Sequence, residues 1–358
     1  MTRTGKAEIL AERFGDKNSG DAGESRADLH LWRFASSGTL VNTSSNVSGE
    51  AAELTDLTRE FLDKTSICLS FLRAVRPYQW VKNILVFVPV ITANAFNDFN
   101  ALVNTASLFI AFCCTASSVY LINDLCDLQV DRSHPSKRMR PFASGSLPIF
   151  TGIAAIPILI AGGFAAALAT GDRSVIVLLL SYFILSNAYS IKLKRFPLVD
   201  VFVLALLYTI RLFSGGLAAR HEVSHWLLAF SGFFFLSLAL VKRVGELKRE
   251  AQKGKIAGRG YSFEDLSILQ TFGIASAFLS SLVLALYIQS EAAAILYIHM
   301  HLLFLIVPLT LFWQCHLWLA TARGHMDDDP IVYASKDKIS WAVGLLIGLI
   351  LLTAKARF

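Results

Sequence analysis

Long apolar stretches recur along most of this chain, and they constrain its fold more than any other feature of the sequence. A helix that crosses a bilayer needs about 20 predominantly apolar residues. Windows that approach this length lie at about 82–96, 104–123, 150–170, 174–190, 198–218, 225–242, 269–289, 294–320 and 340–354. The composition agrees, because 54% of the residues are apolar and the mean hydropathy is +0.53. The sequence therefore predicts an all-α polytopic membrane protein with about nine transmembrane helices.

Positive charge is distributed unevenly between the two sets of loops. Lys and Arg number seventeen in the loops 124–149, 189–197, 242–268 and 321–339. The opposite loops carry only Arg173 and Arg220, although Lys355 and Arg357 near the C-terminus lie on that side too. The positive-inside rule then places the N-terminus and the basic loops in the cytoplasm. The membrane itself is expected to be a bacterial-type inner membrane. The net charge of +6 lies mostly at this face of the lipid bilayer, so it needs no nucleic acid as a partner.

The first part of the chain has a different composition. Residues 1–66 are rich in Gly, Ser, Asn and Asp, which predicts a polar, weakly structured cytoplasmic region without a cleavable signal peptide. One helix is expected from Ala51 to Asp63, because Leu54, Leu57 and Phe61 recur at helical spacing. Residues 67–358 form the predicted transmembrane catalytic domain. Five cysteines in the chain show neither disulfide-like nor metal-like spacing.

An acidic motif, Asn123 to Asp131, follows the second apolar window. On one continuous helix, Asp124, Asp127 and Asp131 would fall within an arc of roughly 60°, with Asn123 beside them. Like charges at this spacing repel each other, and a divalent cation reverses that effect. Mg²⁺ prefers one or two carboxylates and completes its shell with substrate phosphates. The motif is therefore a candidate Mg²⁺ site formed by these three aspartates.

Basic residues follow the acidic motif directly. They are Arg132, His134, Lys137, Arg138 and Arg140. A solvated acidic helix end is the alternative interpretation of the motif taken alone. An acidic cluster for a metal, followed by a basic cluster for the anion that the metal carries, favours a diphosphate site.

Further polar groups gather at other cytoplasmic helix ends. Lys82 and Asn83 begin the first window, and Tyr189 and Lys194 stand where the fourth window ends. At the end of the sixth window, next to Lys242, Arg243 and Glu246 are three residues apart and could pair on a helix. Asp327 to Asp329, farther along the chain, are expected to form a solvated turn.

One charge lies inside an apolar window. Arg211 follows Tyr208 in the fifth window, and a charge at that depth costs roughly 2.5–3.5 kcal/mol on insertion scales. It should therefore face a protein cavity and an anionic partner, or else lie near the interface if the helix starts later. Reactive groups gathered at one face of an apolar bundle suit an enzyme that joins a water-soluble phosphorylated molecule to a membrane lipid. A transporter is less favoured, because transporters place polar groups near the bilayer midplane.

These motifs resemble those of the UbiA superfamily of intramembrane prenyltransferases. The family's N-D-x-x-D-x-x-x-D stands as Asn123, Asp124, Asp127 and Asp131, and its Y-x-x-x-L-K-R as Tyr189, Leu193, Lys194 and Arg195. Over about residues 70–354 the chain is most similar to the decaprenyl-phosphate phosphoribosyltransferase branch. That similarity rests on 76–83, 131–138, Arg140-Pro141 with Gly145, 208–211 with Gly215-Gly216, and Lys242-Arg243 with Glu246-Leu247. A related set of nodulation proteins shares the pattern.

The resemblance implies transfer of 5-phosphoribose from phosphoribosyl pyrophosphate to a polyprenyl phosphate, with Mg²⁺ as cofactor. Catalytic residues would be Asp124, Asp127, Asp131 and Lys194. Substrate-binding residues would be Lys82, Asn83, Asn123, Arg132, Lys137, Arg138, Arg140, Tyr189, Tyr208, Arg211, Lys242, Arg243 and Glu246. The alternative is a prenyltransferase that moves a prenyl chain from a prenyl diphosphate to an aromatic or quinone precursor. It is disfavoured because Lys242 and Arg243 stand where such enzymes carry a second Asp-rich motif.

Overall fold

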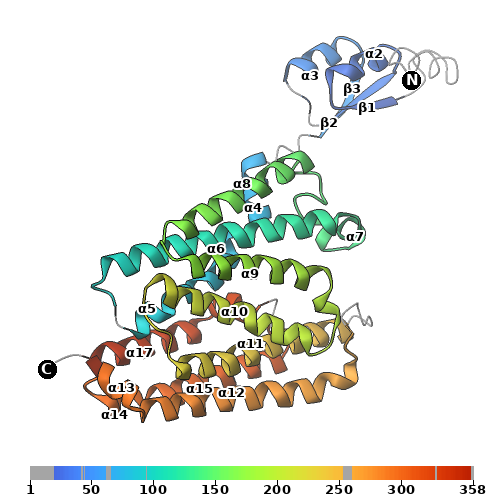
Figure 1. Ribbon diagram of the computed structural model, residues 1–358. Helices are drawn as coiled ribbons and strands as arrows, with labels where there is room; N and C mark the ends of the chain where they lie inside the picture. Colours follow the sequence, from blue (N-terminus) through green and yellow to red (C-terminus); the bar gives the residue numbers. More distant parts are fainter. Residues whose placement is uncertain are drawn as a thin grey trace. The chain divides into compact units, whose positions relative to one another are not determined.

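The structure is a computed structural model that describes residues 20–41, 43, 45–61, 66–93, 95–252, 260–326 and 329–355 (Figure 1). The chain divides into two compact units, Met1–Ser70 and Phe71–Phe358. Each unit has a hydrophobic core of its own.

The first unit contains a small parallel sheet. Its elements are β1 (Gly20–Gly23), η1 (Arg26–Asp28), α2 (Leu29–Trp32), β2 (Ser37–Val41), α3 (Ser45–Ala52) and β3 (Asp56–Phe61). The strands pair in the order β1-β2-β3, and Trp32 and Leu40 lie at the centre of the core. The helix predicted from Ala51 to Asp63 is therefore wrong, since α3 ends at Ala52 and β3 follows. Pairing with β2 supplies the backbone hydrogen bonds of this segment, and that pairing has no signature in the local periodicity.

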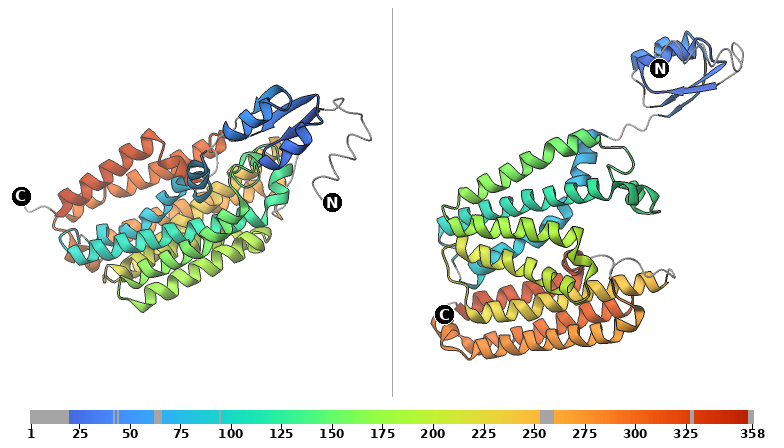
Figure 2. Two further views of the ribbon diagram at one scale, coloured as in Figure 1. Left: turned by 90° about the horizontal axis from the view of Figure 1, so that it is seen from above. Right: turned by 45° about the vertical axis from the view of Figure 1, so that its right-hand side comes forward.

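The second unit is helical. Its elements are α4 (Ile67–Val75, which crosses the unit boundary after Ser70), η2 (Pro77–Phe87), α5 (Val88–Thr92), α6 (Phe99–Cys126), α7 (Leu128–Ser133), η3 (Lys137–Met139), α8 (Ile149–Leu168), α9 (Arg173–Ile191), η4 (Leu193–Arg195), α10 (Val199–Ala218), α11 (His225–Gln252), η5 (Phe263–Asp265), α12 (Leu266–Ile288), α13 (Glu291–Leu296), α14 (Met300–Leu303), α15 (Ile306–Ala322), α16 (Pro330–Ala334) and α17 (Lys338–Lys355). The long helices lie alongside one another in a bundle (Figure 2).

Among the described residues, eight segments are long and apolar enough to cross a membrane, and they coincide with eight of the nine predicted windows. The exception is the first window, 82–96. There the chain forms the 3₁₀ helix η2 and the five-residue α5, with Pro77 and Pro89 at their starts. Proline suits the first turn of a helix and disfavours the interior, where it removes a hydrogen bond, and both prolines stand where a new short helix begins. The chain is a polytopic, all-α membrane protein by these spans.

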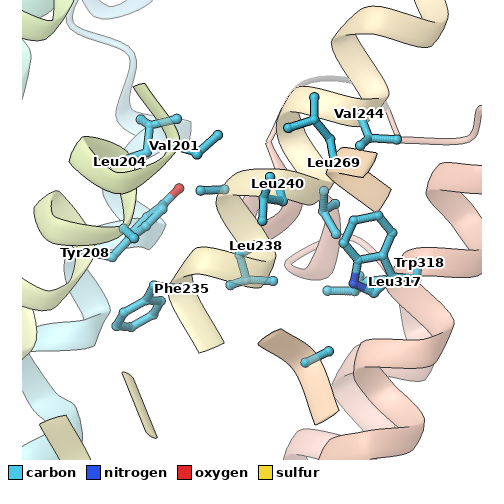
Figure 3. Packing of buried hydrophobic residues seen from close by; sticks show 14 of the residues in the cluster. Val201, Leu204, Tyr208, Phe235, Leu238, Leu240, Val244, Leu269, Leu317 and Trp318 are labelled. Carbon is cyan, nitrogen blue, oxygen red and sulfur yellow. The ribbon is translucent and has the colours of Figure 1, made fainter. Parts of the chain in front are cut away.

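Helices α6 and α10 lie deepest in the bundle. More than half of the apolar window of each is buried, compared with 11% for α17. One core cluster joins α10 to α11, α12 and α15, where Tyr208 packs on Phe235 and Trp318 packs near Leu269 (Figure 3). A second cluster joins α6, α9 and α10. The polar residues at the C-terminal ends of α6 and α11 and at the N-terminal end of α10 are therefore held by two rigid cores.

Helix η2 packs between α6 and α10, and a glycine makes this possible. A Cβ on Gly215 would lie 2.0 Å from the carbonyl oxygen of Val86, so only glycine lets the two backbones approach so closely. The chain enters η2 through Arg76, whose backbone is left-handed at φ 54°. These two features fix the position of the residues between them, Pro77 to Val86.

Candidate active site

The acidic motif spans a break between two helices. Helix α6 ends at Cys126, Asp127 is the C-cap, and α7 starts at Leu128. The prediction of one continuous helix carrying all three aspartates is therefore wrong. Asp124 and Asp131 are 3% and 2% exposed, whereas Asp127 is half-buried between them.

Two arginines hold the two buried aspartates together. Arg140 Nη1 lies 3.0 Å from Asp124 Oδ1 and 2.7 Å from Asp131 Oδ2, and Arg76 Nη2 lies 2.6 Å from Asp124 Oδ1. Arg140 is among the predicted site residues, whereas Arg76 was assigned no role in the site. We refer to Asp124, Asp131, Arg76 and Arg140 as the acidic cluster.

The acidic cluster fits a divalent cation in one respect. Asp124 Oδ2 is buried and accepts no hydrogen bond from any described residue. A buried carboxylate oxygen without a donor is costly, and Mg²⁺ coordination would satisfy it. In the described part of the chain, however, no three acidic, His or Cys side chains form a ready metal cage. The three aspartates thus suit an ion that shares its shell with substrate oxygens rather than one enclosed by protein.

A line of polar contacts runs from the acidic cluster along α6 into the bundle. Arg76 lies over the ring of Tyr120 at 5.0 Å, Trp80 Nε1 donates to Ser117 Oγ at 3.1 Å, and Asn83 Nδ2 donates to Cys113 Sγ at 3.3 Å. Cys113 lies eleven residues before Asp124, which is about 16 Å along a helix. The contacts between η2 and α6 therefore extend about half the thickness of a bilayer core.

Arg211 lies at the inner end of this line. It is 5% exposed, and it donates to Asn83 Oδ1 at 2.8 Å, Tyr182 Oη at 2.8 Å and the Leu207 carbonyl at 2.6 Å. The sequence left open whether Arg211 faces the interior of the bundle or lies near the membrane interface, and the structure places it in the interior. All three partners are neutral, and no described carboxylate pairs with Arg211. Its buried charge is therefore available to an anionic ligand.

A second ionic cluster involves a residue that sequence reasoning missed. Asp329 was expected in a solvated turn, but it is 3% exposed, and Asp327 and Asp328 lie outside the described residues. Its Oδ2 lies 2.7 Å from Lys82 Nζ and 3.6 Å from Lys242 Nζ, and it accepts from Tyr208 Oη at 3.1 Å. Burial by itself raises the pKa of this carboxyl, but Lys82 and Lys242 outweigh burial and hold the pKa well below its ordinary value. We refer to Lys82, Lys242 and Asp329 as the lysine cluster.

Arg243 occupies a different environment from its neighbour Lys242. It is 1% exposed and forms ion pairs with Asp200 and Glu246, and its Nη2 lies 3.4 Å from Tyr189 Oη. Both carboxylates engage its guanidinium, and its role as a phosphate ligand stays a prediction. Glu246 pairs with Arg243 as the sequence spacing predicted. These contacts connect α9, α10 and α11.

The remaining predicted residues are more peripheral. Asn123 Nδ2 donates to Ser190 Oγ at 2.8 Å, which connects the start of the motif to α9. Lys194 is half-buried in η4, while Arg132, Lys137 and Arg138 are exposed at the end of α7 and in η3. Their contacts with a substrate stay predictions.

Tyr120 is a further residue that was not predicted. It lies one turn before Asp124 on the same face of α6, and its ring centroid lies 5.0 Å from the Arg76 guanidinium carbon. Tyr120 therefore adjoins the acidic cluster. In the sequence, only its position four residues before Asp124 could have indicated that Tyr120 belongs to the site.

Comparison with known proteins agrees with this arrangement. The model of the UbiA prenyltransferase family matches residues 84–333. Nodulation protein NoeC of Azorhizobium caulinodans is 35% identical over 79% of this chain and 93% of its own length. An uncharacterised protein of Sinorhizobium fredii, y4nM, is 36% identical over 91% of this chain, which spans only 64% of that protein.

Two further similar proteins have a named activity or a solved structure. A decaprenyl-phosphate phosphoribosyltransferase of Corynebacterium glutamicum is 35% identical over 51% of this chain and 56% of its own length. The solved structure of a UbiA homolog from Archaeoglobus fulgidus bound to GPP and Mg²⁺ superposes with a TM-score of 0.59 at 18% identity, covering 80% of this chain and 98% of that one. At that identity the likeness concerns the fold alone. With the family match and the NoeC similarity covering most of the chain, this protein belongs to the UbiA prenyltransferase family.

Proposed function

We propose that this protein transfers 5-phosphoribose from phosphoribosyl pyrophosphate to a polyprenyl phosphate at the cytoplasmic face of the inner membrane. The observation that carries the proposal is the cationic inner half of the site. Lys82, Lys242 and Arg211 gather within the bundle. Two phosphorylated substrates need more positive charge than a prenyl diphosphate and a neutral aromatic acceptor do. The name of the Corynebacterium glutamicum relative supports the same reaction class.

In this reaction the bond between the anomeric carbon and the diphosphate oxygen breaks, and a bond to an oxygen of the acceptor phosphate forms. Inorganic diphosphate leaves with the bonding electrons. The acceptor is already an anion, so no general base is needed to remove a proton.

The acidic cluster would hold Mg²⁺, with Asp124 and Asp131 as buried ligands and Asp127 beside them. The metal would withdraw charge from the departing diphosphate. Arg76 and Arg140 are placed to bind diphosphate oxygens, because guanidinium groups suit bidentate phosphate contacts. Tyr189 and Lys194 would support the same end of the site from the end of α9.

The test uses purified protein in detergent or nanodiscs with Mg²⁺. Labelled phosphoribosyl pyrophosphate and a polyprenyl phosphate should yield a labelled lipid and inorganic diphosphate. A parallel reaction offers a prenyl diphosphate with an aromatic acceptor. Turnover in the second reaction and none in the first would exclude the proposed function in favour of ordinary prenyl transfer.

A further inference from the structure

Three elements that are distant in the sequence converge on one carboxylate. Lys82 comes from η2, Lys242 from α11 and Tyr208 from α10, and all three contact Asp329. Asp329 also caps α16, because its Oδ1 accepts from the Ile331 amide at 3.1 Å. The carboxylate is thus fixed by a helix start on one side and contacts two cations on the other.

The two ammonium groups need this carboxylate. Both lie within 3.6 Å of the same Asp329 oxygen, so they are close neighbours that repel each other. Lys82 is buried, and burial makes each unpaired charge costly. Arg211 adds a third positive charge nearby, which disfavours the protonated Lys82 further. Without Asp329, the pair would separate or one lysine would lose its proton.

We propose that Asp329 is a positioning residue that holds Lys82 and Lys242 together as a binding pair for a phosphate monoester of one of the substrates. Two lysines and one carboxylate leave a net charge of +1. A phosphate monoester carries about −1.5 to −2 at pH 7, so it complements this pair together with Arg211. The inference rests on the proposed function only for the identity of the ester, which is either the 5-phosphate of the sugar donor or the phosphate of the lipid acceptor.

The experiment measures binding to the full-length protein by calorimetry with two probes that are not turned over. Ribose 5-phosphate represents the donor, and farnesyl phosphate represents the acceptor. Asp329→Asn keeps the size of the side chain and its ability to accept from Tyr208, but it removes the charge. This substitution should raise the Kd of one probe by about tenfold to a hundredfold and leave the Kd of the other probe within about twofold of the wild-type value. Asp329→Glu should restore part of that affinity.

Asp337→Asn is the matched control. Asp337 accepts from the Ser340 amide at 2.8 Å and pairs with His316 at 3.1 Å, and no lysine in the described part of the chain forms an ion pair with it. Both probes should bind this variant as they bind the wild type. In the transfer assay, Asp329→Asn should raise the KM of the same substrate more than it lowers kcat.

A second variant tests the mechanism even if Asp329→Asn is unstable. Lys242→Gln should weaken binding of the same probe. Adding Asp329→Asn to Lys242→Gln should weaken that binding little further, because both changes disrupt one pair. Additive effects, wild-type binding in Asp329→Asn, or no binding of either probe to the wild type would each overturn the proposal. None of these results depends on transfer, so a failure of the proposed function would be seen separately in the turnover assay.

Discussion

The acidic cluster and the lysine cluster are charge-reversed versions of one arrangement. In the acidic cluster, two buried carboxylates are bridged by Arg140 and contacted by Arg76. In the lysine cluster, two ammonium groups share the single carboxylate of Asp329. The first retains a buried carboxylate oxygen without a donor, whereas both oxygens of Asp329 accept hydrogen bonds. This difference matches the proposed roles of the clusters, with a cation at the first and an anion at the second.

The largest expected effect tests the cation side of this comparison. Asp124→Asn should lower kcat/KM by about 10³-fold, because it removes the carboxylate with the unsatisfied oxygen. Steady-state transfer assays at several Mg²⁺ concentrations would measure the loss. Asp172→Asn, which preserves the N-cap of α9 at the other end of the bundle, is the control. Near-normal, Mg²⁺-dependent turnover by Asp124→Asn would show that this cluster is not the metal site.

A smaller effect is expected on the anion side. Arg211→Gln should raise the KM of one phosphorylated substrate by about ten- to a hundredfold, the cost of one charge-assisted hydrogen bond of about 1.5–3 kcal/mol. KM should be measured for both substrates. Arg220→Gln, at the exposed end of the same segment, should leave both values unchanged. If Arg211→Gln lowered only stability, Arg211 would be a packing residue and the anion side would consist of the lysines alone.

The next prediction concerns the packing that keeps the two clusters on one line. Gly215→Ala places a methyl group against the Val86 carbonyl, so η2 must shift or the helices must separate. We expect a loss of about 1–3 kcal/mol in stability, measured by unfolding in detergent. Gly232→Ala, which meets no atom within 4 Å, should cause no such loss. Equal stability of the two variants would mean that η2 is not held as tightly as the contact implies.

The smallest effect is expected from removing the first unit. Neither cluster includes a residue before Arg76, so a chain that starts at Ile67 should retain its kcat and KM within about twofold. The assay is the same transfer reaction, with membrane insertion checked by fractionation. A correctly inserted but inactive truncation would show that the first unit contributes to the site or to its assembly.

Sequence reasoning found those parts of the molecule that depend on local pattern. The apolar windows gave eight spans, since length and hydrophobicity are properties of one segment. The motif at Asp124 was recognisable because its residues are near neighbours in the sequence. Arg211 was identified as an exception because a charge inside an apolar window is costly wherever the helix packs.

The rest depended on contacts between distant segments. Asp329 has the appearance of a solvated turn residue until η2, α10 and α11 are placed around it. Arg243 and Lys242 are adjacent in the sequence, yet one is enclosed by Asp200 and Glu246 and the other reaches Asp329. Strand β3 was assigned as helix because its pairing partner, β2, lies in another part of the chain. In each case the deciding partner was non-local, and local periodicity has no information about it.

The apolar residues beyond Arg211 have a consequence for ion permeability. The polar line along α6 reaches Cys113, and the next buried residues on η2 and α6 are Val86, Phe112 and Leu108, all fully enclosed. A charged group that followed the line inward would meet hydrocarbon, whose barrier to an ion is far above thermal energy. On the proposed function, these apolar side chains would keep a charged substrate at one end of the bundle. A polar substitution at Leu108 would be expected to lower that barrier. Phe112 also lies 5.8 Å from the Arg211 guanidinium, so a substitution there would change the surroundings of Arg211 as well.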